Sequence, residues 1–314
     1  MSPRGLFDRT AVGGYSLLLR LPFAPRPRFH RLRGVPDLGP ALTDISLLGL
    51  CVCIHQKSAL DLDDKVIGNA VCRSIVLKIR RSQMKTLGIV GGLGPESTVD
   101  YYQRIIALCR ERTGDEHYPE FVIASVDLRK GLDFMDANEL SGMADFLFEA
   151  IGKLARGGAD FGIISANTPH IVFDEIAPKS PIPLISIVEA TRAAAKAQNL
   201  KRLALMGTRY TMQSDFYPKV FAREGIELFI PESEDQDYLH EKYFSELVPG
   251  KFLPETRAGL LAIVDRMKAA STIDGVILAG TELPLILRDP IHNGLPLLDT
   301  TKIHVEAAVA EMLS

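Results

Sequence analysis

The sequence predicts an α/β fold in which parallel sheets are flanked by helices and a ligand cleft lies between two similar halves. From residue 87 onward, short apolar segments alternate with amphipathic ones, a pattern typical of parallel strands joined by helical crossovers. Residues 163–170 and 277–284 repeat one pattern, an apolar strand that runs directly into a polar turn. Ligands of such sheets bind beyond the carboxyl ends of the strands, so we expect both turns to face one cleft.

The individual elements follow from apolar periodicity and turn residues. Strands are predicted where short apolar runs end in glycine or polar residues, at 87–90, 121–126, 161–165, 184–187, 202–206 and 273–278. Helices are predicted where apolar residues recur at helical spacing, at 97–112, 139–156, 188–198, 213–224 and 256–269. Glu96, Ser97 and Thr98 are residue types that helix N-termini favour, which supports the first of these helices.

Composition limits the class of protein. The chain has 314 residues, of which 46% are hydrophobic and 24% charged, so it is globular and has enough apolar material for two cores. A net charge of −3 argues against a nucleic-acid partner, which requires a clustered positive surface. The apolar run at 45–54 is too short to span a bilayer, so we expect no membrane segment.

Residues 1–83 differ from the rest, because arginine and proline recur there and no sustained periodicity is present. They are an organellar transit peptide, a disordered extension, or sequence upstream of a true start at Met84; we favour the last. We accordingly expect a cytoplasmic protein, or an organellar one if the transit peptide is real. The 4 cysteines show neither a disulfide framework nor zinc-ligand spacing, so no metal is expected.

Three motifs occur in order along the chain: GGLGP at 91–95, ANTPH at 166–170 and AGTE at 279–282. Together they resemble the aspartate/glutamate racemase superfamily, which typically reads GGMGP, CNTxH and GCTE. The resemblance covers about residues 84–314. It places two catalytic cysteines at positions where this chain has Ala166 and Gly280.

The resemblance implies a fold of two lobes and an activity. The first lobe would comprise residues 84–183 and 291–314, with the last helix returning to it, and the second lobe would comprise 184–290. The implied activity is that of an isomerase: racemisation or epimerisation at the α-carbon of a small amino acid, without a cofactor. The implied ligand is a small amino acid or dicarboxylate, and the implied assembly is a homodimer.

The glycine loop is the first candidate for substrate binding. Gly92 and Gly94 follow a predicted strand and precede a helix, so backbone amides there can receive an anionic group. A dinucleotide fingerprint is disfavoured, because Ser97 occupies its third glycine position and Pro95 removes a donor. The alternative is a tight turn that needs glycine for its backbone angles alone.

Threonines and one asparagine supply the other polar candidates. Asn167 and Thr168 offer an amide and a hydroxyl to a substrate carboxylate, and the resemblance gives this pair the same role. It also implies that Thr281 in the second turn, and Thr208 and Thr211 in a third loop, contact substrate. For each residue, the alternative is a local turn or helix cap.

Catalysis needs groups on both faces of the α-carbon, because racemisation removes a proton from one face and returns one to the other. Ala166 and Gly280 cannot transfer protons, so His170 and Glu282 are the candidate acid/base residues, together with Thr168. The alternatives are a structural histidine bonded to the backbone and a solvated glutamate.

Arg129, with Lys130 as a fallback, is the candidate partner of a side-chain carboxylate, which arginine binds in bidentate fashion. The resemblance places a second basic position at Val248, with Lys251 nearby. Two other functions compete with racemisation: a catalytically silent homologue that binds a small carboxylate, and a decarboxylase or lyase on the same scaffold.

Overall fold

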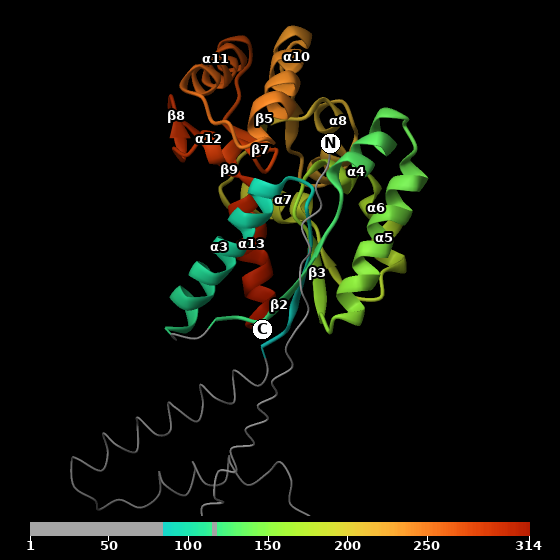
Figure 1. Cartoon of the computed structure of the whole chain (residues 1–314). Coiled ribbons are helices and arrows are strands. Elements are labelled where there is room, and N and C mark those ends of the chain that lie inside the picture. The colour runs from blue at the N-terminus through green and yellow to red at the C-terminus, as the bar shows by residue number, and fades with distance from the viewer. Residues whose placement is uncertain (1–83, 115–117) are drawn as a thin grey trace, which may run out of the picture. The chain divides into compact units, whose positions relative to one another are not determined.

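The computed structural model describes residues 84–114 and 118–314, so the expectations for residues 1–83 lie outside the described residues. All described residues fall in one compact unit of chain. They form the predicted α/β fold, in which two sheets are flanked by helices (Figure 1). Within these ranges, no helix combines the length and apolar character that a bilayer crossing needs.

The first sheet has four parallel strands in the order β2-β1-β3-β4. The strands are β1 (Leu87–Gly91), β2 (Phe121–Ser125), β3 (Phe161–Ile164) and β4 (Leu184–Ile185). All residues of β1 and β3 are buried, as expected of central parallel strands that are covered on both faces.

The second sheet has five strands in the order β6-β5-β7-β9-β8, and only β8 runs antiparallel to its neighbour. The strands are β5 (Arg202–Gly207), β6 (Glu227–Phe229), β7 (Gly275–Ala279), β8 (Ile291–His292) and β9 (Leu295–Asp299). β3 and β7 are therefore both interior strands, and the two polar turns follow their carboxyl ends.

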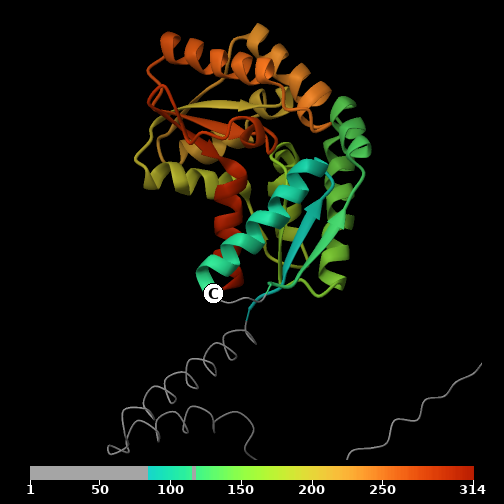
Figure 2. The ribbon, with the colours of Figure 1, turned by 60° about the vertical axis from the view of Figure 1, so that its left-hand side comes forward.

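Helices cover both faces of the first sheet (Figure 2). On one face α3 (Pro95–Thr113) packs with α13 (Thr300–Met312), and on the other lie α4 (Leu128–Asp136) and α5 (Leu140–Arg156). After β3 the chain forms η1 (Thr168–Val172), α6 (Phe173–Ile176) and η2 (Ala177–Lys179). α3 has proline in its first turn and ends at Gly114, whose left-handed backbone (φ 62°) closes the helix.

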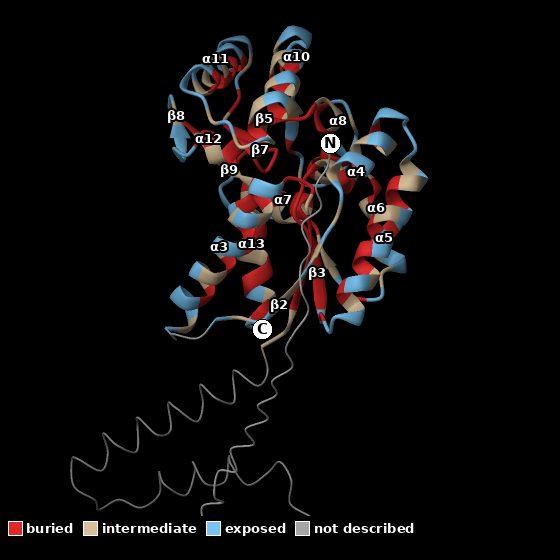
Figure 3. Ribbon diagram, in the orientation of Figure 1, coloured by how far each residue is buried: buried red, intermediate tan, exposed pale blue. Residues whose placement is uncertain are grey.

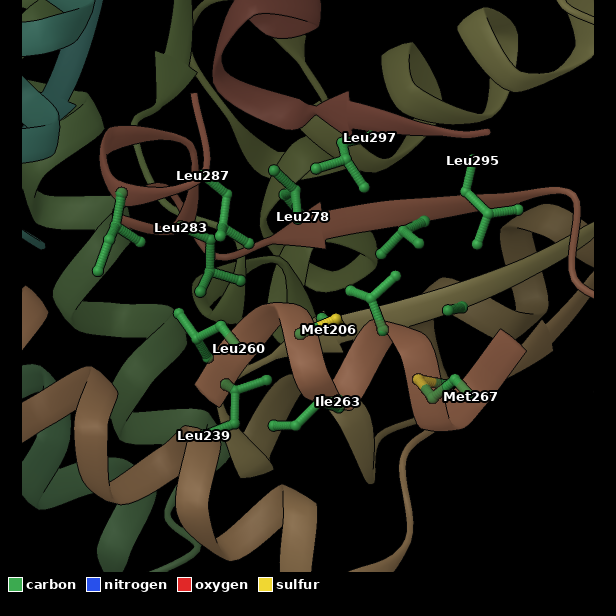
Figure 4. Packing of buried hydrophobic residues seen from close by; sticks show 14 of the residues in the cluster. Met206, Leu239, Leu260, Ile263, Met267, Leu278, Leu283, Leu287, Leu295 and Leu297 are labelled. Atoms are coloured by element: carbon green, nitrogen blue, oxygen red, sulfur yellow. The ribbon is translucent and has the colours of Figure 1, made fainter. Parts of the chain in front are cut away.

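The second sheet is covered in the same way. One face packs against α7 (Ile187–Ala197) and α9 (Phe216–Ala222). The other packs against α10 (Ser233–Lys242), the π-helical turn η3 (Tyr243–Leu247) and α11 (Pro254–Ala270). Leu260 and Ile263 of α11 belong to one buried cluster with Met206 and Leu278 (Figure 4). The short helices α8 (Arg209–Met212) and α12 (Leu283–Ile286) follow β5 and β7. The outward surfaces of α5 and α10 are exposed (Figure 3).

The sheet pairing differs from the expected lobe boundaries at 183 and 291. Leu184–Ile185 still pairs with β3, so the chain leaves the first sheet at Ser186, which caps α7. Residues 291–299 belong to the second sheet as β8 and β9, and the return begins only at Thr300. The last helix, α13, packs against the first sheet.

Sequence periodicity also missed some elements. The helix predicted at 213–224 is shorter, because α9 runs only from Phe216 to Ala222, and the short helix α8 that precedes it at Arg209–Met212 was not predicted. α10 was not predicted, because its ten residues are mostly polar and bury only Gln236 and Leu239.

Candidate active site

A cavity of about 40 Å³ lies between the polar turn after β3 and elements of the second half. Its apolar wall comes mainly from the glycine loop and helices α4 and α5, with Phe244 and Val248 opposite. Its polar lining comprises Asn167, Thr168, Thr208, Tyr210 and Tyr243. Of the described residues that line it, none carries a formal charge at neutral pH.

Asn167 is fixed by hydrogen bonds at both ends of its amide. Its Nδ2 donates to Thr300 Oγ1 at 3.1 Å, and its Oδ1 accepts from the Tyr217 hydroxyl at 2.6 Å. The Asn167 side chain is only 2% exposed and Tyr217 is fully buried. The amide therefore ties the turn after β3 to α13 and α9.

Three threonine hydroxyls meet where the two halves join. Thr168 Oγ1 lies 2.9 Å from both Thr208 Oγ1 and Thr211 Oγ1, and the last two are 3.3 Å apart. Thr208 also caps α8 by accepting from the Thr211 backbone N–H. Of the three, Thr168 and Thr208 line the cavity. The structure thus brings together residues that the sequence placed 40 positions apart.

His170 lies behind this turn, away from the cavity lining. Its Nε2 accepts from the Ile187 backbone N–H at 3.2 Å, so its Nδ1 carries the proton and donates to the Ala166 carbonyl at 2.9 Å. Desolvation by burial, with a smaller contribution from His304, lowers the pKa of His170 to about 3. The ring is therefore neutral and fully bonded to the backbone, which matches the structural alternative.

Glu282 is buried at the corresponding turn after β7. Its Oε2 accepts hydrogen bonds from the Tyr243 hydroxyl and, at 3.0 Å, from Thr281 Oγ1. Its Oε1 is buried with no hydrogen-bond partner. Burial raises the pKa of Glu282, and the bonds from Tyr243 and Thr281 only partly offset this. Neither Glu282 nor Thr281 lines the cavity, because Tyr243 stands in front of them.

Ala166 and Gly280 end up in different surroundings. Ala166 lines the cavity directly. A Cβ at Gly280 would lie 2.5 Å from Cε2 of Tyr243 and 3.0 Å from its hydroxyl oxygen. The aromatic ring therefore fills the space that a side chain at Gly280 would enter. No sequence pattern singled out Tyr243, which lies 37 positions earlier in a polar stretch.

The glycine loop touches the second turn as well as its own half. Gly94 (φ 153°) contacts Glu282 Oε1 so closely that a Cβ would collide with it. Gly92 (φ 82°) donates its N–H to Thr98 Oγ1 at 2.9 Å, and a Cβ there would collide with the Val126 carbonyl. Both glycines are thus required by backbone angle and close packing, and neither lines the cavity.

Arg129 lies on the solvent side of α4. Its side chain is 66% exposed and pairs with Asp133 at 2.6 Å and Asp136 at 3.2 Å. Asp136 in turn accepts from the hydroxyl of Tyr210, which links α4 to α8 at the rim of the cavity. Val248, where the resemblance places a second basic residue, lines the cavity with an apolar side chain. No cation of the described chain is therefore placed to meet a ligand carboxylate inside it.

The groups that line the cavity can form hydrogen bonds with a ligand. In the described ranges, no three His, Cys, Asp or Glu side chains gather as metal ligands would. The cavity has hydroxyl groups on two sides and apolar groups elsewhere. This arrangement places hydrogen-bonding groups in a small, largely apolar cavity.

Comparison with known proteins agrees with this architecture. The broad specificity amino-acid racemase RacX of Bacillus subtilis is 26% identical over 232 residues, which cover 73% of this chain and 98% of RacX. Among solved structures, an aspartate racemase homologue from Pyrococcus horikoshii is 31% identical with a TM-score of 0.62, covering 74% of this chain and all of that one. A candidate Asp/Glu racemase from Yersinia pestis is 29% identical with a TM-score of 0.65 at the same coverage.

A family model described as Asp/Glu/Hydantoin racemase matches residues 90–308, which span both sheets and all three motifs. Because the match extends over well over half of the sequence, the chain belongs to the Asp/Glu/Hydantoin racemase family.

Proposed function

We propose that this protein is an amino-acid racemase that acts at the α-carbon of a small amino acid without a cofactor. The observation that carries the proposal is the cavity at the junction of the two halves, lined by Asn167 and Thr168 after β3 and by Thr208 after β5. RacX, which is similar over nearly its whole length, is a broad specificity amino-acid racemase. The expected cytoplasmic location and homodimer belong to the same proposal; subcellular fractionation and analytical ultracentrifugation would test them.

Substrate binding in this proposal uses the turn after β3. The Thr168 N–H at the start of η1 is suited to the α-carboxylate. The next two positions offer no donor, because Pro169 has no N–H and the His170 N–H donates to the Asn167 carbonyl at 3.0 Å. The Asn167 side chain holds that turn in place through Tyr217 and Thr300. Thr168 presents its hydroxyl to one face of the α-carbon, and its bonds to Thr208 and Thr211 let protons pass among three hydroxyls.

The lining favours a substrate with an apolar side chain. A second carboxylate, as in aspartate or glutamate, would lose its hydration in a cavity whose lining carries no formal charge. Burying an unpaired carboxylate is strongly unfavourable, whereas an aliphatic side chain gains from contact with Met135, Met143 and Phe244. The exposed, acid-paired position of Arg129 supports the same preference.

Substrate entry requires the site to open. A volume of about 40 Å³ holds only a few water molecules, so an amino acid cannot enter the cavity as it stands. The hydrogen bond between Tyr210 and Asp136 joins α8 to α4 at the rim, so it is the contact that opening would break first. Closure around the substrate would then exclude water from the reacting carbon.

The test is α-proton exchange in D2O with L- and D-amino acids, followed by NMR for deuterium incorporation and by chiral chromatography for inversion. We expect both signals without added cofactor, and higher rates with leucine, methionine or valine than with aspartate or glutamate. Thr168→Val should reduce both, while Thr272→Val, at an exposed threonine remote from the cavity lining, should not.

Absence of α-proton exchange with every amino acid would refute the racemase. A silent homologue would then show a ligand-dependent rise in melting temperature without exchange. A decarboxylase or lyase would release a smaller product from a malonate-type substrate.

A further inference from the structure

We propose that Tyr243 is the catalytic acid/base group on the β7 side of the cavity, with Glu282 as the partner that exchanges its proton. This rests on the proposed racemase function, which requires groups on both faces of the α-carbon. Thr168 serves the β3 side. At the end of β7, Gly280 has no side chain, and the ring of Tyr243 occupies the space that one would take.

The position of Tyr243 is the first support. Its ring lines the cavity, although only 6% of the residue is exposed. It is the first residue of the π-helical turn Tyr243–Leu247, where α10 gives way to a wider turn. Such π-helical turns are rare and are often found at functional sites.

The state of Glu282 is the second support. The residue is 1% exposed, and its Oε1 is buried without a partner against Gly94. An unpartnered buried carboxyl oxygen is costly, so a purely structural role leaves it unexplained. A carboxyl group that alternates between the ionised and the protonated form explains why this turn holds an acid at all.

The proton transfer balances between the two residues and solvent. As the Cα–H bond of one enantiomer breaks, its electron pair stays on the substrate as a carbanion and the proton passes to the Tyr243 oxygen. The hydroxyl proton of Tyr243 moves at the same time to Glu282 Oε2, along the hydrogen bond already present. Thr168 then donates a proton to the opposite face of the carbanion and regains one from solvent as Glu282 releases one.

The reverse direction uses the same groups in the opposite roles. Thr168 Oγ1 takes the α-proton of the other enantiomer while its own hydroxyl proton passes by way of Thr208 or Thr211 to solvent. Tyr243 donates its proton to the carbanion and recovers one from the protonated Glu282. Burial raises the pKa of Tyr243 well above its ordinary value, and the charge of Glu282 raises it further. A free tyrosinate is therefore inaccessible, so the transfer must be coupled to the carboxylate.

The experiment compares Tyr243→Phe, Glu282→Gln and wild type in D2O, with each enantiomer of an active amino acid supplied separately. Tyr243→Phe should slow racemisation by about 10²- to 10⁴-fold, the usual contribution of a general acid/base group. It should abolish α-proton exchange for the enantiomer whose proton faces Tyr243 and spare exchange of the other. The control is Tyr102→Phe, at a tyrosine that is 48% exposed and outside the cavity lining.

Glu282 acts through Tyr243, so its test includes the pH dependence of catalysis, which a purely structural role would not change. With the enantiomer whose α-proton faces Tyr243, the kcat/KM of wild type should rise with pH as Glu282 ionises, and Glu282→Gln should remove that limb of the profile. A second pair of variants guards against misfolding: Tyr243→Ala should be inactive, and adding Gly280→Cys should restore exchange. A thiol with a pKa of about 8.5 then replaces the phenol at the same strand end.

The outcomes are separable. If wild type exchanges no α-proton with any amino acid, the proposed function fails and this proposal fails with it. If wild type is active and folded Tyr243→Phe exchanges both enantiomers at the wild-type rate, Tyr243 is not the acid/base group, while the racemase stands. Failure of Gly280→Cys to raise the activity of Tyr243→Ala would likewise count against the shared position.

Discussion

Replacing Tyr217 by phenylalanine should destabilise the protein and loosen the turn after β3. The change removes one hydroxyl and keeps the ring, which is fully buried between α9 and the second sheet. That hydroxyl donates to Asn167 Oδ1 at 2.6 Å, and Asn167 is itself 2% exposed. Phenylalanine therefore leaves a buried amide oxygen without its donor.

The expected loss is about 1–3 kcal/mol in the free energy of unfolding, the cost of a buried polar atom whose partner is removed. For a folded region of 150–250 residues, each 1 kcal/mol lowers the melting temperature by about 2–4 °C, so the expected shift is about 2–12 °C. Urea unfolding followed by circular dichroism gives the free energy, and calorimetry gives the melting temperature.

The matched control is Tyr102→Phe, because the Tyr102 side chain is 48% exposed and its loss should stay within about 0.5 kcal/mol. The two variants remove the same hydroxyl from a tyrosine ring, so their difference isolates the buried bond. A Tyr217→Phe protein as stable as the control would refute the reasoning that Asn167 depends on this bond.

Three further perturbations test other parts of the structure. Gly280→Ala should lower the free energy of unfolding by about 1–3 kcal/mol, because its methyl group would collide with the Tyr243 ring. Gly131→Ala is the control: it lies in a helix, its new methyl group would have its nearest neighbour at 3.7 Å, and it should be neutral or stabilising when both variants are unfolded in urea. Burial lowers the pKa of His170 to about 3 and of His304 to about 4. Below about pH 6.5 the unfolded chain therefore binds more protons than the folded one. The stability that the neutral rings contribute is complete above about pH 6.5 and falls by up to about 1.4 kcal/mol per pH unit per histidine as the pH drops. Urea unfolding between pH 7.5 and pH 5 should show this slope, His304→Gln should flatten it, and equal stability across the range would contradict it. Arg129→Ala should leave KM for an active amino acid unchanged in steady-state assays, because the guanidinium faces solvent and its acid partners; a large rise in KM would instead place Arg129 at the substrate.

The strand-to-turn pattern predicted the structure most accurately. The last residues of β3 and β7 lie within one position of the prediction, because an apolar run that stops at polar residues is a local signal. The glycine loop also contacts the turn at Glu282, which the sequence did not predict. The ends of the lobes were misplaced, because β8 and β9 contain few β-branched residues and one proline.

The sequence predicted some of the residues that line the candidate site and missed others. Asn167, Thr168 and Thr208 line the cavity, and each follows directly from a strand that the sequence identifies. Thr281 and Glu282 follow such a strand too, yet they lie behind an aromatic ring from a distant helix. The role of Tyr243 could not be predicted from the sequence. It depends on the absence of a side chain at Gly280 and on the π-helical turn, and neither produces a periodic pattern in the sequence.

The sequence by itself determined the α/β architecture, the family and the turns that end the central strands, because apolar periodicity and glycine-rich turns are encoded by neighbouring residues. Only the tertiary structure decided which groups face the cavity. That choice depends on how α4, α8 and η3 pack against the two turns, which is a matter of contacts between residues far apart in the chain. The backbone-bonded His170, the uncharged lining and the pairing of Tyr243 with Glu282 all result from that packing.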